Sequence, residues 1–295
     1  MELAPLEKKD LKELASLIKK SSPGLEFVNP AVLQEQSFGD PDAEPSFLIK
    51  AVEKKQIVAA VLGVARKQGA ARTGFVKYFG VLPKFRRRGA GQAAFSELER
   101  RFQKREIREI KVGGCPPPFL QGGVGVTDTA SVSFLLKRGY KRHDDIIDMT
   151  TPLGKWKPTL KDGDGALQKE FSLRRASAKD EGALVEMAQA HFQGWVYEIR
   201  AGLKKGCVFM GSQDGKAVAF CCGDATNPGF FGPMGTVESL RGRGLARLLS
   251  NRTLEAMKKS GHKSARIPWV GPIPFYAAYA GASLGPIYWA FVKNV

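Results

Sequence analysis

The sequence predicts two tandem α/β domains, each built around a mixed β-sheet. Three observations support this fold class. The chain has 295 residues, 43% of them hydrophobic, which is enough for two cores of ordinary size. In both halves, amphipathic helical patterns alternate with the apolar runs typical of strands. One short phrase rich in glycine and arginine occurs twice, 155 residues apart, and indicates an internal repeat.

The first predicted domain, residues 1–150, begins with a helix and continues through a group of strands. Leu11, Leu14 and Leu17 stand at helical spacing within residues 6–20. The later elements are strands at 47–52, 57–65 and 74–82, a helix with Phe95, Leu98 and Phe102 on one face, a strand at 107–112, and a short helix at 129–140 that Gly139 ends.

The second predicted domain, residues 169–295, repeats this order after a linker. Residues 151–168 are rich in Gly, Pro, Lys and Asp and show no sustained period, which is typical of an exposed connection. The expected elements are a strand at 171–176, a helix at 177–192 capped by Ser177 or Asp180, a hairpin at 207–223 around Asp214-Gly215, a strand at 230–237, a helix carrying Leu245, Leu248 and Leu249, a strand at 263–268 and a helix at 271–282.

Composition limits the classes of partner. A net charge of +17 favours anionic partners, but no basic stretch interleaved with aromatic residues indicates nucleic-acid binding. Four cysteines without a CxxC pair and three scattered histidines argue against a metal site or a disulfide framework. No run approaches the ~18 apolar residues of a membrane span, and the charged N-terminus does not resemble a signal peptide, so we expect a cytoplasmic monomer or homodimer that does not bind membranes.

The repeated phrase has the properties of a pyrophosphate-binding loop. It reads FRRRGAGQAA at residues 85–94 and LRGRGLARLL at 240–249, each time between a predicted strand and a predicted helix. Glycines let the backbone turn close to a ligand, a helix N-terminus offers unpaired N–H groups, and arginine matches phosphate oxygens. Neither copy is a Walker motif or a GxGxxG motif. The candidate residues are Arg86, Arg87, Arg88, Gly89, Ala90 and Gly91, and Arg241, Gly242, Arg243, Gly244, Leu245 and Ala246.

In this setting the phrases resemble the acyl-CoA-binding motif of the GCN5-related N-acetyltransferases (GNAT), Gln/Arg-x-x-Gly-x-Gly/Ala. The first copy matches at Arg86, Gly89 and Gly91; the second matches at Arg241, Gly244 and Ala246, but Glu238 replaces the usual proline. The resemblance covers nearly the whole chain as two tandem GNAT-type domains. It implies acetyl-CoA as co-substrate, with the pantetheine between splayed strands. The backbone groups expected to face it belong to Phe79, Val81, Met234 and Thr236.

The resemblance also implies direct attack of a primary amine on the thioester in a ternary complex. Tyr276, five residues before Gly281, is then the candidate proton donor if the last helix contains a one-residue irregularity, whereas Leu135 takes that place in the first half. A packed core tyrosine is the alternative. Lys77 stands where some relatives carry Glu. Asp224 and Glu238 are the candidate bases, although Asp224 is equally suited to cap a turn and a water chain can replace both.

These residues favour catalysis in the C-terminal domain, and the opposite assignment remains the alternative. The excess of positive charge suits a small neutral or anionic amine better than a polycation. Two other classes stay open. One is a degenerate pair that binds CoA as a sensor or scaffold, and the other, less favoured, is a nucleic-acid-binding protein.

Overall fold

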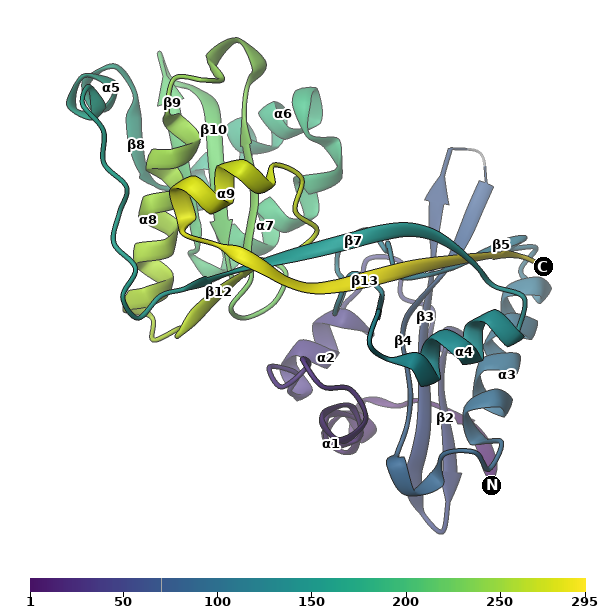
Figure 1. Cartoon of the computed structure of the whole chain (residues 1–295). Coiled ribbons are helices and arrows are strands. Elements are labelled where there is room, and N and C mark those ends of the chain that lie inside the picture. Colours follow the sequence, from purple (N-terminus) through teal and green to yellow (C-terminus); the bar gives the residue numbers. More distant parts are fainter. Residues whose placement is uncertain (70) are drawn as a thin grey trace. The chain divides into compact units, whose positions relative to one another are not determined.

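The computed structural model describes residues 1–69 and 71–295 (Figure 1). Contacts divide the chain into two compact units. The first unit contains Met1–Ile146 together with Ile287–Val295, and the second contains Ile147–Pro286. The division differs from the predicted domains at three places: residues 147–150, predicted in the first domain, belong to the second unit, the predicted linker 151–168 belongs to it as well, and the last nine residues of the chain belong to the first unit.

The first unit is a mixed sheet covered by helices on both faces. Val61 and Leu62 are neighbours on β3 and point to opposite faces, so Val61 packs with α3 and α4 while Leu62 packs with α1 and α2. Strands follow the order β1-β2-β3-β4-β5-β13, and only β4 and β5 are parallel in it. The elements are β1 (Glu2–Pro5), α1 (Leu11–Ser21), α2 (Pro30–Gln36), β2 (Leu48–Glu53), β3 (Gln56–Gln68), β4 (Ala71–Val81), α3 (Ala90–Lys104), β5 (Glu109–Val112), β6 (Val124–Gly125), α4 (Thr129–Lys137) and the end of β13 (Ser283–Asn294).

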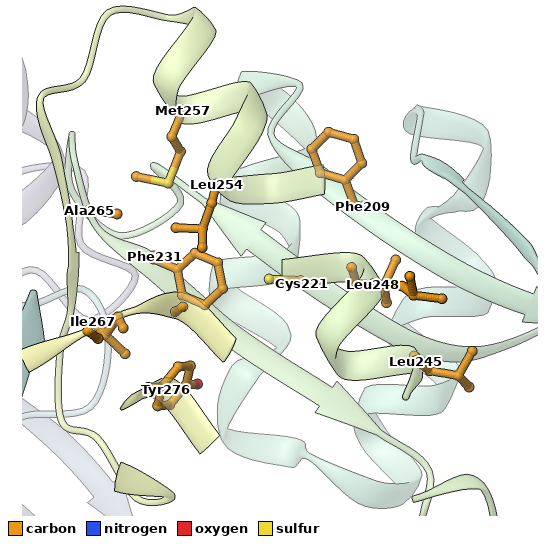
Figure 2. Packing of buried hydrophobic residues seen from close by; sticks show 14 of the residues in the cluster. Phe209, Cys221, Phe231, Leu245, Leu248, Leu254, Met257, Ala265, Ile267 and Tyr276 are labelled. Atoms are coloured by element: carbon orange, nitrogen blue, oxygen red, sulfur yellow. The ribbon is translucent and has the colours of Figure 1, made fainter. Parts of the chain in front are cut away.

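The second unit repeats this plan. Phe220 packs with α6 and α7, whereas its neighbour Cys221 packs with α8 and α9 on the other face, where Leu254 lies close to Phe231 (Figure 2). The sheet order is β11-β10-β9-β8, and β12 pairs with the end of β7. The elements are the end of β7 (Lys141–Pro152), α5 (Asp164–Glu170), β8 (Ser172–Arg175), α6 (Glu181–His191), α7 (Val196–Lys205), β9 (Val208–Gln213), β10 (Lys216–Gly223), β11 (Phe231–Thr236), α8 (Leu245–Lys259), β12 (Ser264–Ile267) and α9 (Ile273–Ala280).

The predicted tandem α/β class is confirmed, with a mixed sheet in the first unit, whereas the strands of the four-stranded sheet in the second unit pair antiparallel. Both repeats run strand, helix, helix, three strands, helix, strand, helix, strand, apart from the short extra elements β6 and α5. α3 and α8 have 15 residues each. The sequence did not specify α5, which begins within the predicted linker and ends two residues after it.

The closing strand of each unit comes from the other repeat. β7 follows α4 in sequence, but its residues 149–152 pair with β12 in the second unit. β13 follows α9, but its residues 291–294 pair with β5 in the first unit. Phe291 is fully buried there among side chains of α3 and α4. The C-terminal residues are therefore part of the first unit's core.

Residues 1–69 and 71–295 contain neither a membrane-spanning helix nor a cluster of metal ligands. No helix is long and apolar enough to cross a bilayer. No group of three or more His, Cys, Asp or Glu side chains is arranged to hold a metal ion.

We predict that Phe291→Ala destabilises the first unit by about 3–5 kcal/mol, because it removes a fully buried ring. Hydrogen exchange followed by mass spectrometry measures this unit by unit: protection should fall in α3 and β5 and remain in α8. Asn294→Ala, at an exposed position of the same strand, is the matched control. Loss of protection confined to the second unit would contradict this role of the C-terminal strand.

Candidate functional site

The parallel strands of the first unit separate before β4 ends. β4 pairs with β5 from Thr73 to Val76 and then continues alone on that side to Val81. The separation starts at Lys77, which is an extra residue in the β3–β4 ladder, since Leu62 pairs with Tyr78 and Gly63 with Val76. Such a bulge bends a strand and ends its regular pairing. The end of β4 is left with one edge that no neighbouring strand pairs in the described structure.

Backbone groups at this edge point away from β3. The Leu82 N–H donates to the Val58 carbonyl over 2.9 Å, so Val81 and Phe79 direct their N–H and C=O groups the other way. The Val81 carbonyl accepts a hydrogen bond from Arg86 Nε over 3.3 Å. The two strand residues named from the sequence in this unit therefore lie at the open edge.

The second unit has the same arrangement. A single parallel bridge, Phe230 with Arg266, links the β11 and β12 segments. The Val237 N–H donates to the Val218 carbonyl over 2.9 Å, so Thr236 and Met234 turn their backbone groups away from β10. Arg241 Nε donates to the Thr236 carbonyl over 3.3 Å, as Arg86 does to Val81.

The two arginine loops also share their backbone conformation. A short 3-10 helix follows each strand, and then Arg86 and Arg241 adopt φ/ψ of −65°/153° and −66°/157°. Gly89 and Gly244 precede α3 and α8 with φ of 84° and 98°, a left-handed conformation that favours glycine. Neither glycine can cap the helix with a side chain, so the N–H groups of the first turn are available to an anion.

The first loop, residues 82–89, is open. A Cβ atom built on Gly89 would meet no described atom within 4 Å. Arg86 also donates to the Ser21 carbonyl over 3.1 Å, and Arg88 lies over the Phe85 ring at 5.7 Å. A cavity of about 370 Å³ lies beside the first turn of α3, and it is lined by Gln92, Phe134, Lys137, Arg138 and Lys293.

The second loop, residues 237–244, is covered by α5. Glu170 forms a bidentate ion pair with Arg243, at 2.9 and 2.6 Å. A Cβ atom on Gly244 would lie 3.4 Å from the Leu167 side chain. The two loops therefore share a backbone and differ in their surroundings.

Tyr276 occupies the place on α9 that Leu135 has on α4. The Tyr140 N–H donates to the Leu135 carbonyl over 3.1 Å, five residues back, whereas the Ala282 N–H donates to the Tyr276 carbonyl over 3.1 Å, six residues back. The helix end thus contains the one-residue irregularity that the sequence requires. The Tyr276 side chain is buried beside Phe231 in the apolar cluster, and burial raises its pKa (Figure 2).

Asp224 and Glu238 lie at opposite ends of β11. Asp224 accepts a hydrogen bond from the Gly229 N–H over 2.6 Å and lies 3.0 Å from His262 Nε2, so it organises the turn before the strand. Glu238 follows the strand; its side chain is 86% exposed and 3.7 Å from Arg241. The six residues of β11 separate the two carboxylates, so they do not form one site together with Tyr276.

The sequence analysis missed a buried charge cluster at the bulge. Lys77 Nζ lies 2.7 Å from Asp40 Oδ2 and donates to the Gln36 carbonyl over 2.5 Å. Arg66 holds both oxygens of the same carboxylate, at 2.5 and 2.8 Å. Burial alone would raise the pKa of Asp40, but Lys77 and Arg66 together lower it. The available signal was the presence of two cations in apolar strand runs, because buried cations require an anion.

Comparison with known proteins supports this geometry. Residues 11–140 match the model of the acetyltransferase (GNAT) family. The match lies within the first unit and includes the first arginine loop. No curated protein matches the sequence.

Three solved structures share the fold over 99% of this chain. The GCN5-related glucosamine N-acetyltransferase region of a fungal multi-domain GH3 β-N-acetylglucosaminidase has a TM-score of 0.74 at 15% identity, and this chain spans 38% of it. A GCN5-related N-acetyltransferase from Sphaerobacter thermophilus has a TM-score of 0.66 at 18% identity, with 95% of it covered. A tandem GNAT protein from the clavulanic acid biosynthesis pathway has a TM-score of 0.66 at 15% identity, with 98% covered.

The first unit therefore carries a domain of the GNAT family, and the whole chain has the tandem GNAT fold, as the sequence predicts. Proteins of this fold use an acyl-CoA, and the family comprises acetyltransferases.

We predict that Asp40→Asn destabilises the first unit by about 3–5 kcal/mol, because it leaves two buried cations without their carboxylate. Urea unfolding measures the change. Asp42→Asn is the matched control: Asp42 also contacts Arg66, but its side chain is 50% exposed, so the expected cost is below about 1 kcal/mol.

The pH dependence of this effect follows from the lowered pKa of Asp40. The stabilisation is present above the carboxyl pKa of the unfolded chain, about 4, and is lost as the pH falls through the lower folded value. Equal destabilisation by the two asparagine variants would contradict the central role of Asp40.

Proposed function

We propose that this chain, with its tandem GNAT fold, is an N-acetyltransferase that moves the acetyl group of acetyl-CoA to a primary amine of a small molecule by direct attack in a ternary complex. We further propose that the first unit holds acetyl-CoA. The sequence alone favours catalysis in the C-terminal unit. The surroundings of the two loops support the opposite assignment, which the sequence analysis kept as its alternative.

The observation that carries this proposal is the cavity beside the open first loop. Its volume of about 370 Å³ lies within the usual range for ligand sites. Lys137, Arg138 and Lys293 supply positive charge for phosphate groups, and Phe134 supplies an apolar wall. Glu99 pairs with both Arg138 and Lys293, which holds these two cations at the cavity and offsets part of their charge, so Lys137 is the cavity cation for which the described structure shows no ion pair. A cavity that joins positive charge, an apolar wall and free helix N–H groups suits a nucleotide thioester.

The residues of the first unit would act mainly by positioning. Free N–H groups at Phe79 and Val81 are suited to hold the pantetheine and to stabilise negative charge on the thioester oxygen. Acetyl-CoA supplies the activated acyl group. Leu135 cannot protonate the leaving thiolate, and Lys77 is already paired with Asp40. We therefore expect orientation of the reactants to provide most of the rate enhancement, with water accepting the amine proton.

The charge of the chain supports a small acceptor. With a net charge of +17, the protein repels polycationic amines and attracts neutral or anionic ones. An amino sugar or an amino acid fits this condition.

A second candidate function is CoA binding without turnover, as in a sensor. Leu135 in the position of the acid and the buried Lys77–Asp40 pair near the bulge favour it. The two candidates differ in one measurement, which is amine-dependent release of free CoA thiol.

We predict that Gly89→Glu weakens acetyl-CoA binding at least about 100-fold, or about 2.7 kcal/mol, because its carboxylate would stand where the pyrophosphate is expected. Calorimetric titration measures the affinity. Gly89→Ala is the matched control, because it introduces the same left-handed strain, about 1–2 kcal/mol, without the charge. Equal losses in both variants would mean that strain, and not phosphate exclusion, causes the effect.

We predict that the wild-type chain releases CoA thiol in the presence of a small neutral or anionic amine, and that Gly89→Glu abolishes this release. A thiol-reactive dye follows the reaction across a panel of amines. If CoA release persists in Gly89→Glu and is lost in Tyr276→Phe, the active site would lie in the second unit. Binding without release for every amine tested would favour the sensor.

A further inference from the structure

Residues 156–170 run along the length of α8, from its last turn to the loop before it (Figure 1). The Trp156 carbonyl accepts from Lys258 Nζ over 3.0 Å. The Thr159 carbonyl accepts from both Asn251 and Arg247, at 2.9 and 2.7 Å. Asp164 and Glu170 then pair with Arg247 and Arg243, respectively. We call these residues the 156–170 segment.

This segment occupies the place that the open cavity has in the first unit. Arg247 stands 155 residues after Gln92, the same spacing as between the two loops, and Gln92 lines the first unit's cavity. In the second unit, Arg247 is instead buried by the segment.

The opposite wall of the cavity shows the same relation. α4 and the residue after it supply Lys137 and Arg138 to the cavity in the first unit. On its counterpart α9, the Tyr279 carbonyl accepts from Thr159 Oγ1 over 3.2 Å, and the Tyr279 hydroxyl accepts from Lys161 Nζ over 3.1 Å. The segment therefore bridges α8 and α9 where the first unit leaves space between α3 and α4.

The segment also brings anionic groups to the phosphate-binding loop. Arg247 holds Asp164 through both nitrogens, with 5% and 10% of the two side chains exposed, and Arg243 holds Glu170 in the same bidentate way. These ion pairs lower the pKa of both carboxyl groups, so both are ionised at neutral pH. Leu167, which stands between the two carboxylates in the sequence, lies close enough to Gly244 that a Cβ atom there would be 3.4 Å from its side chain. Two carboxylates thus take the guanidinium groups nearest the start of α8.

We propose that the 156–170 segment is an internal occupant of the second unit's acyl-CoA site, with Asp164 and Glu170 in place of the phosphate groups. This inference rests on the proposed function of the first unit. It follows that the chain binds one acetyl-CoA, and that the second loop accepts a cofactor only when the segment is displaced. Because the segment is tethered at both ends, its effective concentration is on the order of millimolar, so at equal intrinsic affinity it outcompetes a ligand present at micromolar concentration.

The test measures binding to the second loop alone. Gly89→Glu serves as the parent variant because it blocks the first loop, and calorimetry with acetyl-CoA should then show no binding. Adding Asp164→Asn and Glu170→Gln removes both charges while keeping the side-chain shapes, and should restore measurable binding, with a Kd at least about tenfold below the detection limit that applies to the parent. Adding Asp162→Asn, an exposed carboxylate of the same segment, is the matched control and should change nothing.

A second readout guards against misfolding, since Asp164→Asn weakens a buried ion pair. Glu170→Gln alone, at a side chain 39% exposed, keeps that pair and should give a smaller gain in the same parent. In each folded variant that gains binding, acetyl-CoA should speed proteolysis within residues 156–163, because the ligand displaces the segment.

The outcomes separate the two proposals. A stoichiometry of two in the wild-type chain would overturn the internal occupant, and so would a folded double-charge variant that gains no binding. No binding in the wild type, together with a gain in the charge variants, would overturn the proposed role of the first unit and support the occupied second site. No binding in any variant would overturn both.

Discussion

Each unit depends on one geometric constraint: a strand runs on past its parallel neighbour and ends in a left-handed glycine before a helix. The bulge at Lys77 starts this separation in the first unit. In the second unit β11 pairs with β10 along one edge, and in the described structure its other edge is joined to the β12 segment through the bridge of Phe230 with Arg266. Unpaired backbone groups at a strand edge and at a helix start require partners. The fold therefore creates two adjacent sets of free N–H groups, one at the strand edge and one at the helix start. The function of each unit depends on which ligand or protein group accepts hydrogen bonds from them.

The two copies have kept this backbone while their side chains have diverged. Arg86 and Arg241 share φ, ψ and the hydrogen bond to the strand carbonyl five residues before them. Around the first loop the polar contacts of Arg86 are backbone carbonyls, which leave the positive charge of its guanidinium uncompensated. Around the second loop, carboxylates from α5 neutralise Arg243 and Arg247. A loop whose arginines are neutralised by carboxylates of the same chain is stable without a ligand. A loop whose arginine charge is not compensated gains stability when it binds an anion.

Local chemistry explains which features the sequence predicts. Gly89 and Gly244 are predicted because a left-handed N-cap next to a phosphate site restricts the residue type, and the helices after them are predicted by their apolar stripes. Three features depend on tertiary structure. Strand pattern does not reveal that β13 pairs with β5 or β7 with β12. The polar composition of 151–168 is that of a linker, and only its ion pairs with α8 distinguish it. The partner of Lys77 lies 37 residues away, at Asp40, in an irregular loop.

Because the chain has many more basic than acidic residues, the positions of its carboxylates indicate where negative charge has a structural role. The chain has 46 lysines and arginines but 29 aspartates and glutamates, so carboxylates are in short supply over most of the molecule. Two of them nevertheless converge on the second loop, each holding an arginine in bidentate geometry. Bidentate guanidinium–carboxylate pairs have nearly the same donor geometry as guanidinium–phosphate pairs. Arg243 in this loop and Arg247 in the first turn of α8 can therefore retain the geometry of a phosphate site while a part of the same chain fills it.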